Sequence, residues 1–173
     1  MKIDALKAAI RDVHDFPIAG IVFKDITPIL SDPQLFRAAV RLFETRLKTK
    51  GIGKVAAIEA RGFVFGAALA DRLKLGFVPI RKKGKLPYRT FEESYDLEYG
   101  SATLAIHQDA FAPGEPVVLI DDLLATGGTA LASARLIEKA GGVVAEIDFL
   151  VELAFLNGRA KLGDYPVFAP IVF

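Results

Sequence analysis

The chain has 173 residues, of which 52% are hydrophobic and 25% charged, a composition typical of one compact globular domain. Its formal net charge of +1 argues against a nucleic-acid-binding protein, which usually carries a clear basic excess. The absence of cysteine excludes disulfides, thiolate metal sites and a cysteine nucleophile. Residues 1–16 do not have the pattern of a signal peptide, and no apolar run approaches the length of a membrane span. We therefore expect a cytoplasmic protein with no nucleic-acid or membrane partner.

The first third of the chain predicts two helices separated by a loop. Apolar residues recur at helical spacing over residues 3–10, and proline and glycine between residues 17 and 28 predict the loop. Ser31-Asp32-Pro33 is typical of a helix start, with a polar cap followed by a proline in the first turn. The apolar spacing from Phe36 to Leu47 predicts the buried face of the second helix.

From residue 54 onward, predicted strands and helices alternate, which favours an α/β fold with a central parallel sheet flanked by helices. The predicted strands cover residues 54–59, 77–80, 101–106, 117–120 and 143–153, and the predicted helices begin at residues 64 and 129. Residues 81–99 are polar and charged and predict a long mobile connection. Connections of that length in compact domains are usually functional or disordered.

The strand over residues 117–120 is followed by two acids, a short loop that ends in small residues, and a helix. Ligands of open parallel sheets bind beyond the carboxyl ends of the strands, and a helix N-terminus offers unpaired N–H groups that suit a phosphate. Small side chains allow close backbone approach, and threonine hydroxyls add donors. The predicted phosphate loop consists of Ala125, Thr126, Gly127, Gly128 and Thr129.

Asp121 and Asp122 precede this loop and are separated from it by Leu123 and Leu124. Two carboxylates beside a phosphate would repel it, so they are expected to bind another part of the ligand. Vicinal sugar hydroxyls are good partners because ionised carboxylates are strong acceptors, and the combination predicts a ribose 5-phosphate site. The alternative is that both acids cap the next helix or lie in solvent.

The segment VVLIDDLLATGGTA resembles the phosphoribosyl-diphosphate-binding motif of type I phosphoribosyltransferases. The longer match, to the members that act on adenine, runs in order through GIVFKDITPIL, EARGFVFG, IRKKGKLP, SYDLEYG and LVEL and spans nearly the whole chain. The resemblance implies a type I phosphoribosyltransferase fold in a single domain over residues 1–173. It also implies a small N-terminal hood that binds the base (residues 1–32) and a mobile lid (residues 81–99).

The resemblance further implies that adenine and phosphoribosyl diphosphate give AMP and diphosphate, a purine salvage reaction. Mg²⁺ would bind through the substrate, with no metal site built from protein ligands alone, and the enzyme would be a homodimer. By the same resemblance, the loop at residues 125–129 holds the 5-phosphate, and Asp121 and Asp122 hold the ribose hydroxyls.

For the diphosphate, the resemblance points to Arg61, whose planar fork suits phosphate oxygens, and implies a strained or cis peptide bond before it. The alternative is an arginine that pairs with a nearby acid at the helix start. Arg81, Lys82 and Lys85 would form part of the lid over the diphosphate. The alternative for these three is a solvated run of charges, the more common outcome for such a pattern.

At the end of the predicted lid, Glu98 would act as general base for the proton that leaves the purine nitrogen. Tyr99 would pack on the ribose or phosphate region. The alternative for Glu98 is a structural acid at the end of a strand.

Val22, Phe23 and Lys24 would form the adenine pocket, with apolar faces for stacking and backbone groups that read the amine and ring nitrogen. Many relatives carry arginine where this chain has Lys24, so a side-chain role and a backbone role are both open. The alternative for Val22 and Phe23 is simple core packing.

Three other functions compete with this interpretation. The first is a phosphoribosyltransferase for another purine, namely hypoxanthine, guanine or xanthine. The second is a regulator that senses phosphoribosyl diphosphate, which would need a DNA-binding module for which the chain has little room. The third is a purely structural α/β domain, which leaves the TGGT sequence after paired acids unexplained.

Overall fold

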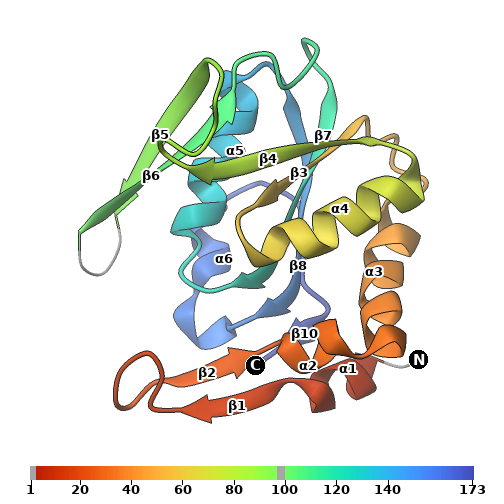
Figure 1. Ribbon diagram of the computed structural model, residues 1–173, viewed down its shortest axis with the longest axis vertical. Coiled ribbons are helices and arrows are strands. Elements are labelled where there is room, and N and C mark those ends of the chain that lie inside the picture. The colour runs from red at the N-terminus through yellow and green to blue at the C-terminus, as the bar shows by residue number, and fades with distance from the viewer. Residues whose placement is uncertain (1–2, 97–99) are drawn as a thin grey trace. The chain divides into compact units, whose positions relative to one another are not determined.

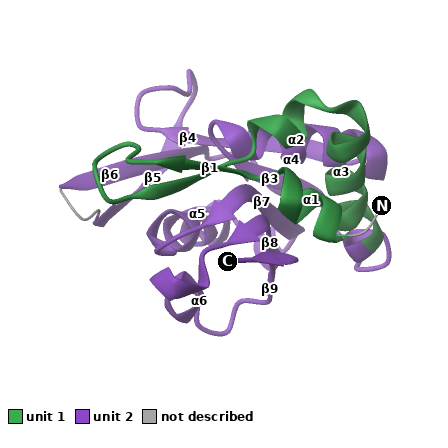
Figure 2. Ribbon diagram, turned by 90° about the horizontal axis from the view of Figure 1, so that it is seen from below, with its two compact units in different colours: residues 1–45 green, residues 46–173 purple. Residues whose placement is uncertain are grey.

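The computed structural model describes residues 3–96 and 100–173 (Figure 1). The chain divides into two compact units, residues 1–45 and residues 46–173, which Figure 2 colours separately. Within the described ranges, no helix has both the length and the apolar character needed to cross a membrane. The single-domain organisation with a hood and a lid stays a prediction.

The first unit combines short helices with a two-stranded sheet. Its elements are α1 (Ile3–Ala9), β1 (Arg11–His14), β2 (Val22–Asp25), α2 (Thr27–Ser31) and most of α3 (Pro33–Leu47). The two predicted helices are confirmed as α1 and α3. The Asp32 carboxylate caps α3 by accepting hydrogen bonds from the backbone N–H groups of Gln34 and Leu35, at 2.8 and 2.9 Å.

The hairpin of β1 and β2 lies where a loop was predicted, so that prediction was wrong. The strands pair antiparallel, with Arg11 opposite Asp25 and His14 opposite Val22. Each strand has only four residues and no buried side chain, so the apolar alternation that marks a strand in a sequence is missing. The Arg11–Asp25 ion pair across the hairpin is a contact that periodicity does not reveal.

The second unit is built on a mostly parallel sheet, as predicted. The strand order is β10-β8-β7-β3-β4-β6-β5, with β9 paired to β8. The strands are β3 (Lys54–Ile58), β4 (Gly76–Lys82), β5 (Thr90–Asp96), β6 (Ser101–His107), β7 (Pro116–Leu124), β8 (Val143–Glu152), β9 (Val167–Phe168) and β10 (Ile171–Val172). The helices are α4 (Arg61–Leu73), α5 (Gly128–Lys139) and α6 (Gly158–Lys161), with a 3₁₀ turn η1 (Ala154–Leu156).

Two helices cover the central strands. The chain passes from β3 through α4 to β4 and from β7 through α5 to β8, stepping in opposite directions across the sheet. Because parallel crossovers are right-handed, α4 and α5 lie on opposite faces of the sheet (Figure 1). The core between α5 and the sheet includes fully buried Leu119, Leu136, Ile137 and Ile147.

The structure differs from the predicted sheet in two places. β6 pairs antiparallel with β4, and β5 pairs antiparallel with β6, so this edge of the sheet is a hairpin. Residues 90–96 therefore form a strand where a connection without regular structure was predicted. β5 is polar because its side chains are exposed or half-buried, and one of its acids, Glu93, pairs with Arg135 and Lys139 of α5. In addition, β7 does not stop at Asp121 as predicted but continues to Leu124.

Candidate active site

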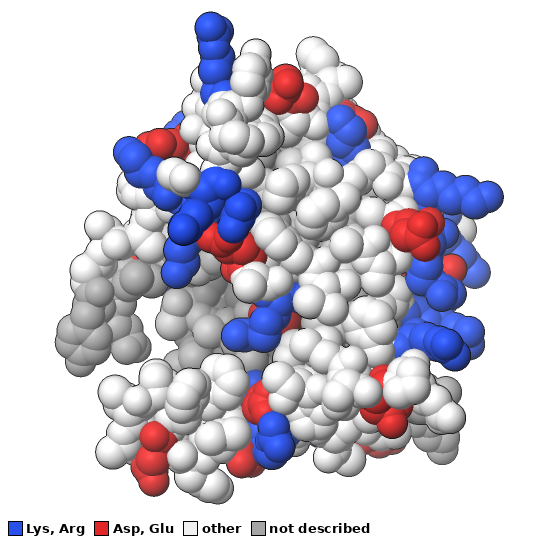
Figure 3. All heavy atoms as spheres, in the orientation of Figure 1, with Lys and Arg blue, Asp and Glu red and all other residues white. Residues whose placement is uncertain are grey.

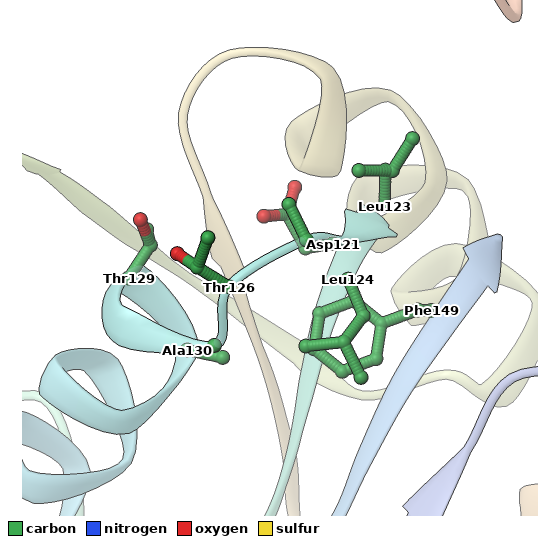
Figure 4. A pocket seen from close by; sticks show the side chains of 9 residues that line it. Asp121, Leu123, Leu124, Thr126, Thr129, Ala130 and Phe149 are labelled. Carbon is green, nitrogen blue, oxygen red and sulfur yellow. The ribbon is translucent and has the colours of Figure 1, made fainter. Parts of the chain in front are cut away.

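The candidate site lies at the carboxyl end of β7, where a pocket opens between the end of the strand and the start of α5. Its lining includes Asp121 and most of the predicted phosphate loop, together with Leu124 and Phe149 (Figure 4). The adjacent strands β3 and β7 feed crossovers that run in opposite directions. Pockets at such a switch point are the usual ligand sites of open α/β sheets.

The predicted phosphate loop connects β7 to α5. Gly127 has a φ of +81°, in the left-handed region that favours glycine, and α5 begins at the next residue. Figure 4 shows the hydroxyls of Thr126 and Thr129 and the carboxylate of Asp121 on one side of the loop. Leu124 and Phe149 lie on the other side. The loop therefore has a polar face at a helix N-terminus, an arrangement suited to an anion.

The two acids of the site share a crowded environment. Asp122 is only 4% exposed, and its backbone N–H donates to Asp121 Oδ1 at 2.9 Å. Burial raises the pKa of Asp121 well above its ordinary value, and the negative charge of Asp122 raises it further. A ligand that brings hydroxyl donors or a positive charge would favour the ionised form.

Arg61, the first residue of α4, is placed beside the acid pair. Its Nε donates to Asp122 Oδ2 at 2.5 Å, and roughly half of its side chain is exposed. Arg61 therefore pairs with an acid, as in the alternative, but the acid lies in β7 and not at the start of α4. A cis peptide bond lies between Glu59 and Ala60, one bond before the position that the resemblance implied.

The basic residues of the predicted lid begin at the end of β4. Arg81 Nε donates to Glu59 Oε2 at 2.8 Å, and one terminal nitrogen of Arg81 donates to the carbonyl of Lys85 at 3.0 Å. The backbone N–H of Lys82 donates to Glu59 Oε1 at 2.7 Å. Lys82 and Lys85 are exposed. On the face drawn in Figure 3, Lys and Arg side chains cluster next to Asp and Glu side chains.

The predicted adenine residues form β2 in the first unit. Val22 is 39% exposed, and the ring of Phe23 meets that of Phe16 edge to face at 5.3 Å between centroids. Lys24 Nζ donates to Asp12 Oδ1 across the hairpin at 2.6 Å.

Glu98 and Tyr99 lie outside the described residues, so their predicted roles as general base and ribose or phosphate contact stay predictions. Three described residues near the site were not predicted, namely Glu59, Tyr95 and Gly158. Glu59 and Tyr95 belong to the motifs EARGFVFG and SYDLEYG, in which roles were predicted only for other residues. Gly158 follows the last motif, and no local pattern marks it.

The chain is similar to known proteins over most of its length. A model of the phosphoribosyl transferase domain matches residues 25–161. An adenine phosphoribosyltransferase of Christiangramia forsetii is 55% identical over 162 residues, covering 94% of this chain and 95% of its own length.

Two solved structures are similar over nearly the whole chain. The crystal structure of adenine phosphoribosyltransferase from Thermoanaerobacter pseudethanolicus has a TM-score of 0.96 and 50% identity, covering 99% of this chain and 100% of that one. The Saccharomyces cerevisiae enzyme, complexed with an imino-altritol bisphosphate and adenine, has a TM-score of 0.94 and 40% identity, with 98% of each chain covered.

Proposed function

The chain belongs to the phosphoribosyl transferase family, and we propose that it joins adenine to phosphoribosyl diphosphate, giving AMP and diphosphate. The observation that carries this function is the arrangement at the end of β7, where an acid pair lies two residues before a loop at a helix N-terminus. Full-length relatives named for the same activity support it, and the reaction is one of purine salvage.

In this proposal, the loop at residues 125–129 binds the 5-phosphate through backbone N–H groups and the hydroxyls of Thr126 and Thr129. The positive end of the α5 dipole adds to the attraction. Asp121 and Asp122 accept hydrogen bonds from the ribose hydroxyls. The polar face of the loop and the position of Asp121 in the same pocket support this assignment.

Loss of diphosphate leaves positive charge on the ribose ring, and fixed carboxylates beside the ring stabilise such charge. The crowding that raises the pKa of Asp121 supports this role, because a neighbouring positive charge relieves the repulsion between the two acids. Asp121 and Asp122 also have the carboxylate chemistry that Mg²⁺ prefers, and the ion would offset the charge of the departing diphosphate.

The diphosphate is assigned to Arg61 and to Arg81, Lys82 and Lys85 of the lid. Arg61 already lies beside Asp122, and incoming phosphate oxygens would share its donors. The hydrogen bonds from Arg81 and Lys82 to Glu59 support a fixed start to the lid. Tyr99 packs near the ribose or phosphate, and Glu98 takes the proton from the purine nitrogen.

Adenine is assigned to Val22, Phe23 and Lys24. The exposure of Val22 and the edge-to-face contact of Phe23 with Phe16 support an aromatic and aliphatic surface for a flat base. Because the Lys24 ammonium is bound to Asp12, recognition through the backbone is the better-supported role. A homodimer and a cytoplasmic location complete the proposal, and light scattering on the purified protein would test the dimer.

The test is a panel of bases with phosphoribosyl diphosphate and magnesium, in which diphosphate release is followed with adenine, hypoxanthine, guanine and xanthine. Turnover with adenine alone supports the proposal, and turnover only with an oxopurine overturns the choice of base. Binding of phosphoribosyl diphosphate without turnover of any base would instead indicate a sensor. An Asp122→Asn variant purified in parallel controls for contaminating host enzyme, because it should lose most of the activity.

A further inference from the structure

Tyr95 of β5 contacts the phosphate loop at two points. In the structure, the Thr129 hydroxyl donates a hydrogen bond to the Tyr95 hydroxyl at 3.1 Å. Its ring lies against Gly128, so that a β-carbon added to Gly128 would lie 3.2 Å from Tyr95 Cδ2. A residue from the sheet edge therefore supports both the backbone and a hydroxyl at the start of α5.

The position of Tyr95 is fixed by contacts further along the same two elements. Lys139 of α5 donates to Glu93 Oε2 at 2.6 Å and to the carbonyl of Glu92 at 3.0 Å. Arg135 of α5 also reaches Glu93, at 3.5 Å. β5 is an edge strand of the sheet, and these contacts fasten it along α5. Tyr95 thus lies at the end of β5 nearest the phosphate loop, and the contacts with α5 hold β5 in place.

The chemistry of a phosphate decides how this pair of hydroxyls must be oriented. An ionised phosphate oxygen only accepts hydrogen bonds, so Thr129 must donate its one proton to bind it. The bond between Thr129 and Tyr95 then survives only if Tyr95 is the donor. Tyrosine can act in this way, whereas phenylalanine of nearly the same shape cannot.

We propose that Tyr95 is a positioning residue of the 5-phosphate site, which donates to Thr129 and so turns the Thr129 hydroxyl toward the phosphate. This inference rests on the proposed function, because it needs a phosphate bound at residues 125–129. The hydroxyl orients Thr129, and the ring supports Gly128.

Tyr95→Phe separates the two contributions, because it keeps the ring and removes the hydroxyl. The loss of one neutral hydrogen bond to a binding group predicts a KM for phosphoribosyl diphosphate about three- to tenfold higher, with the KM for adenine unchanged. Tyr165→Phe is the matched control, since its hydroxyl donates to Glu138 at 2.7 Å and neither residue belongs to the phosphate loop. Equal effects of the two substitutions, or equal rises in both KM values, would overturn the inference.

A double-mutant cycle with Thr129→Val tests whether Tyr95 acts through Thr129. If it does, the double variant Tyr95→Phe/Thr129→Val binds phosphoribosyl diphosphate no more weakly than Thr129→Val alone. Additive losses would mean that Tyr95 does not act through Thr129.

Calorimetry with ribose 5-phosphate repeats the cycle without any need for turnover. The same pattern of affinities supports the positioning role even if no base is turned over, in which case the proposed function alone fails. Unchanged affinity in Tyr95→Phe, with wild-type binding intact, overturns the positioning role alone.

Discussion

Gly127 of the phosphate loop and Gly158 of α6 are in direct backbone contact. A β-carbon on Gly127 would overlap the carbonyl oxygen of Gly158. A β-carbon on Gly158 would overlap the carbonyl oxygen of Ala125 and lie 2.9 Å from the amide nitrogen of Gly127. The start of α6 therefore packs directly against the backbone of the loop, and neither glycine position has room for a side chain.

Gly158→Ala is expected to displace the phosphate loop. Overpacking of this kind typically costs about 1–3 kcal/mol of folding stability, and the displaced N–H groups bind phosphate less well. We expect the KM for phosphoribosyl diphosphate to rise about tenfold, a loss of roughly 1.4 kcal/mol of binding, in steady-state assays. Gly76→Ala is the control, because the nearest atom to its added carbon is a Lys54 side-chain carbon at 3.5 Å. Similar kinetics for Gly158→Ala and the wild type would contradict the buttressing role.

The contact between Gly127 and Gly158 illustrates what the sequence could predict and what it could not. The phosphate loop was predicted because its signal is local: a buried strand, two acids and small residues before a helix. The α/β fold was likewise predicted, from apolar segments whose spacing alternates between that of strands and that of helices. The role of Gly158 depends on a close approach between distant segments, which leaves no local pattern.

The same reasoning explains the elements that were missed. In β5, Glu93 pairs with Lys139 and Arg135 of α5. Its charge therefore serves a tertiary contact, but in the sequence the polar segment looks like a solvated loop. The pairing of Arg61 with Asp122 joins the ends of β3 and β7, which meet only because the strands are adjacent in the sheet. Periodicity identifies elements, but the order of the strands decides which side chains meet.

Glu59→Gln is expected to loosen the start of the lid. Burial opposes ionisation of Glu59, but hydrogen bonds from Lys82 and Arg81 outweigh it and lower the pKa of Glu59 below its ordinary value. Glutamine keeps an acceptor for Lys82 but loses the charge that holds Arg81. We expect the KM for phosphoribosyl diphosphate to rise about three- to tenfold, with the KM for adenine unchanged.

The control for Glu59→Gln is Glu92→Gln, which breaks the more exposed ion pair with Lys83, 2.8 Å long in the structure. Exposed pairs contribute little, so Glu92→Gln should change either KM by less than about twofold. If both variants behave alike in steady-state assays, Glu59 has no special role in placing Arg81.

Lys24→Met distinguishes recognition of adenine by backbone from recognition by the Lys24 side chain. Because Lys24 pairs with Asp12 across the hairpin, Lys24→Met and Asp12→Asn remove the same ion pair. Backbone recognition predicts that both variants raise the KM for adenine by similar amounts, less than about fivefold, since an exposed pair contributes at most about 1 kcal/mol. A much larger rise in Lys24→Met alone would indicate that the ammonium contacts the base.

Asp148 predicts an unusual dependence of stability on pH. Its carboxylate is buried in β8, and neither oxygen has a hydrogen-bond partner within residues 3–96 and 100–173. Burial, reinforced by the negative charge of Glu146, raises the pKa of Asp148 to about 8, although Arg46 and Lys50 oppose the shift. The folded protein therefore keeps Asp148 protonated at pH values where the unfolded chain, with an ordinary pKa of about 3.9, has released the proton.

The sign of the effect follows from which state binds the proton. The stability that protonated Asp148 contributes is complete below about pH 4 and declines by up to about 1.4 kcal/mol per pH unit until about pH 8, where it is lost. Asp148→Asn removes the titrating group. In urea unfolding at pH 5, 6, 7 and 8, the free energy of unfolding of the variant should therefore increase relative to that of the wild type as pH rises. Asp164→Asn, at an exposed position, is the control and should give a parallel curve. A constant difference between Asp148→Asn and the wild type over this range would mean that Asp148 is ionised in the folded state throughout, with Arg46 and Lys50 compensating for its burial.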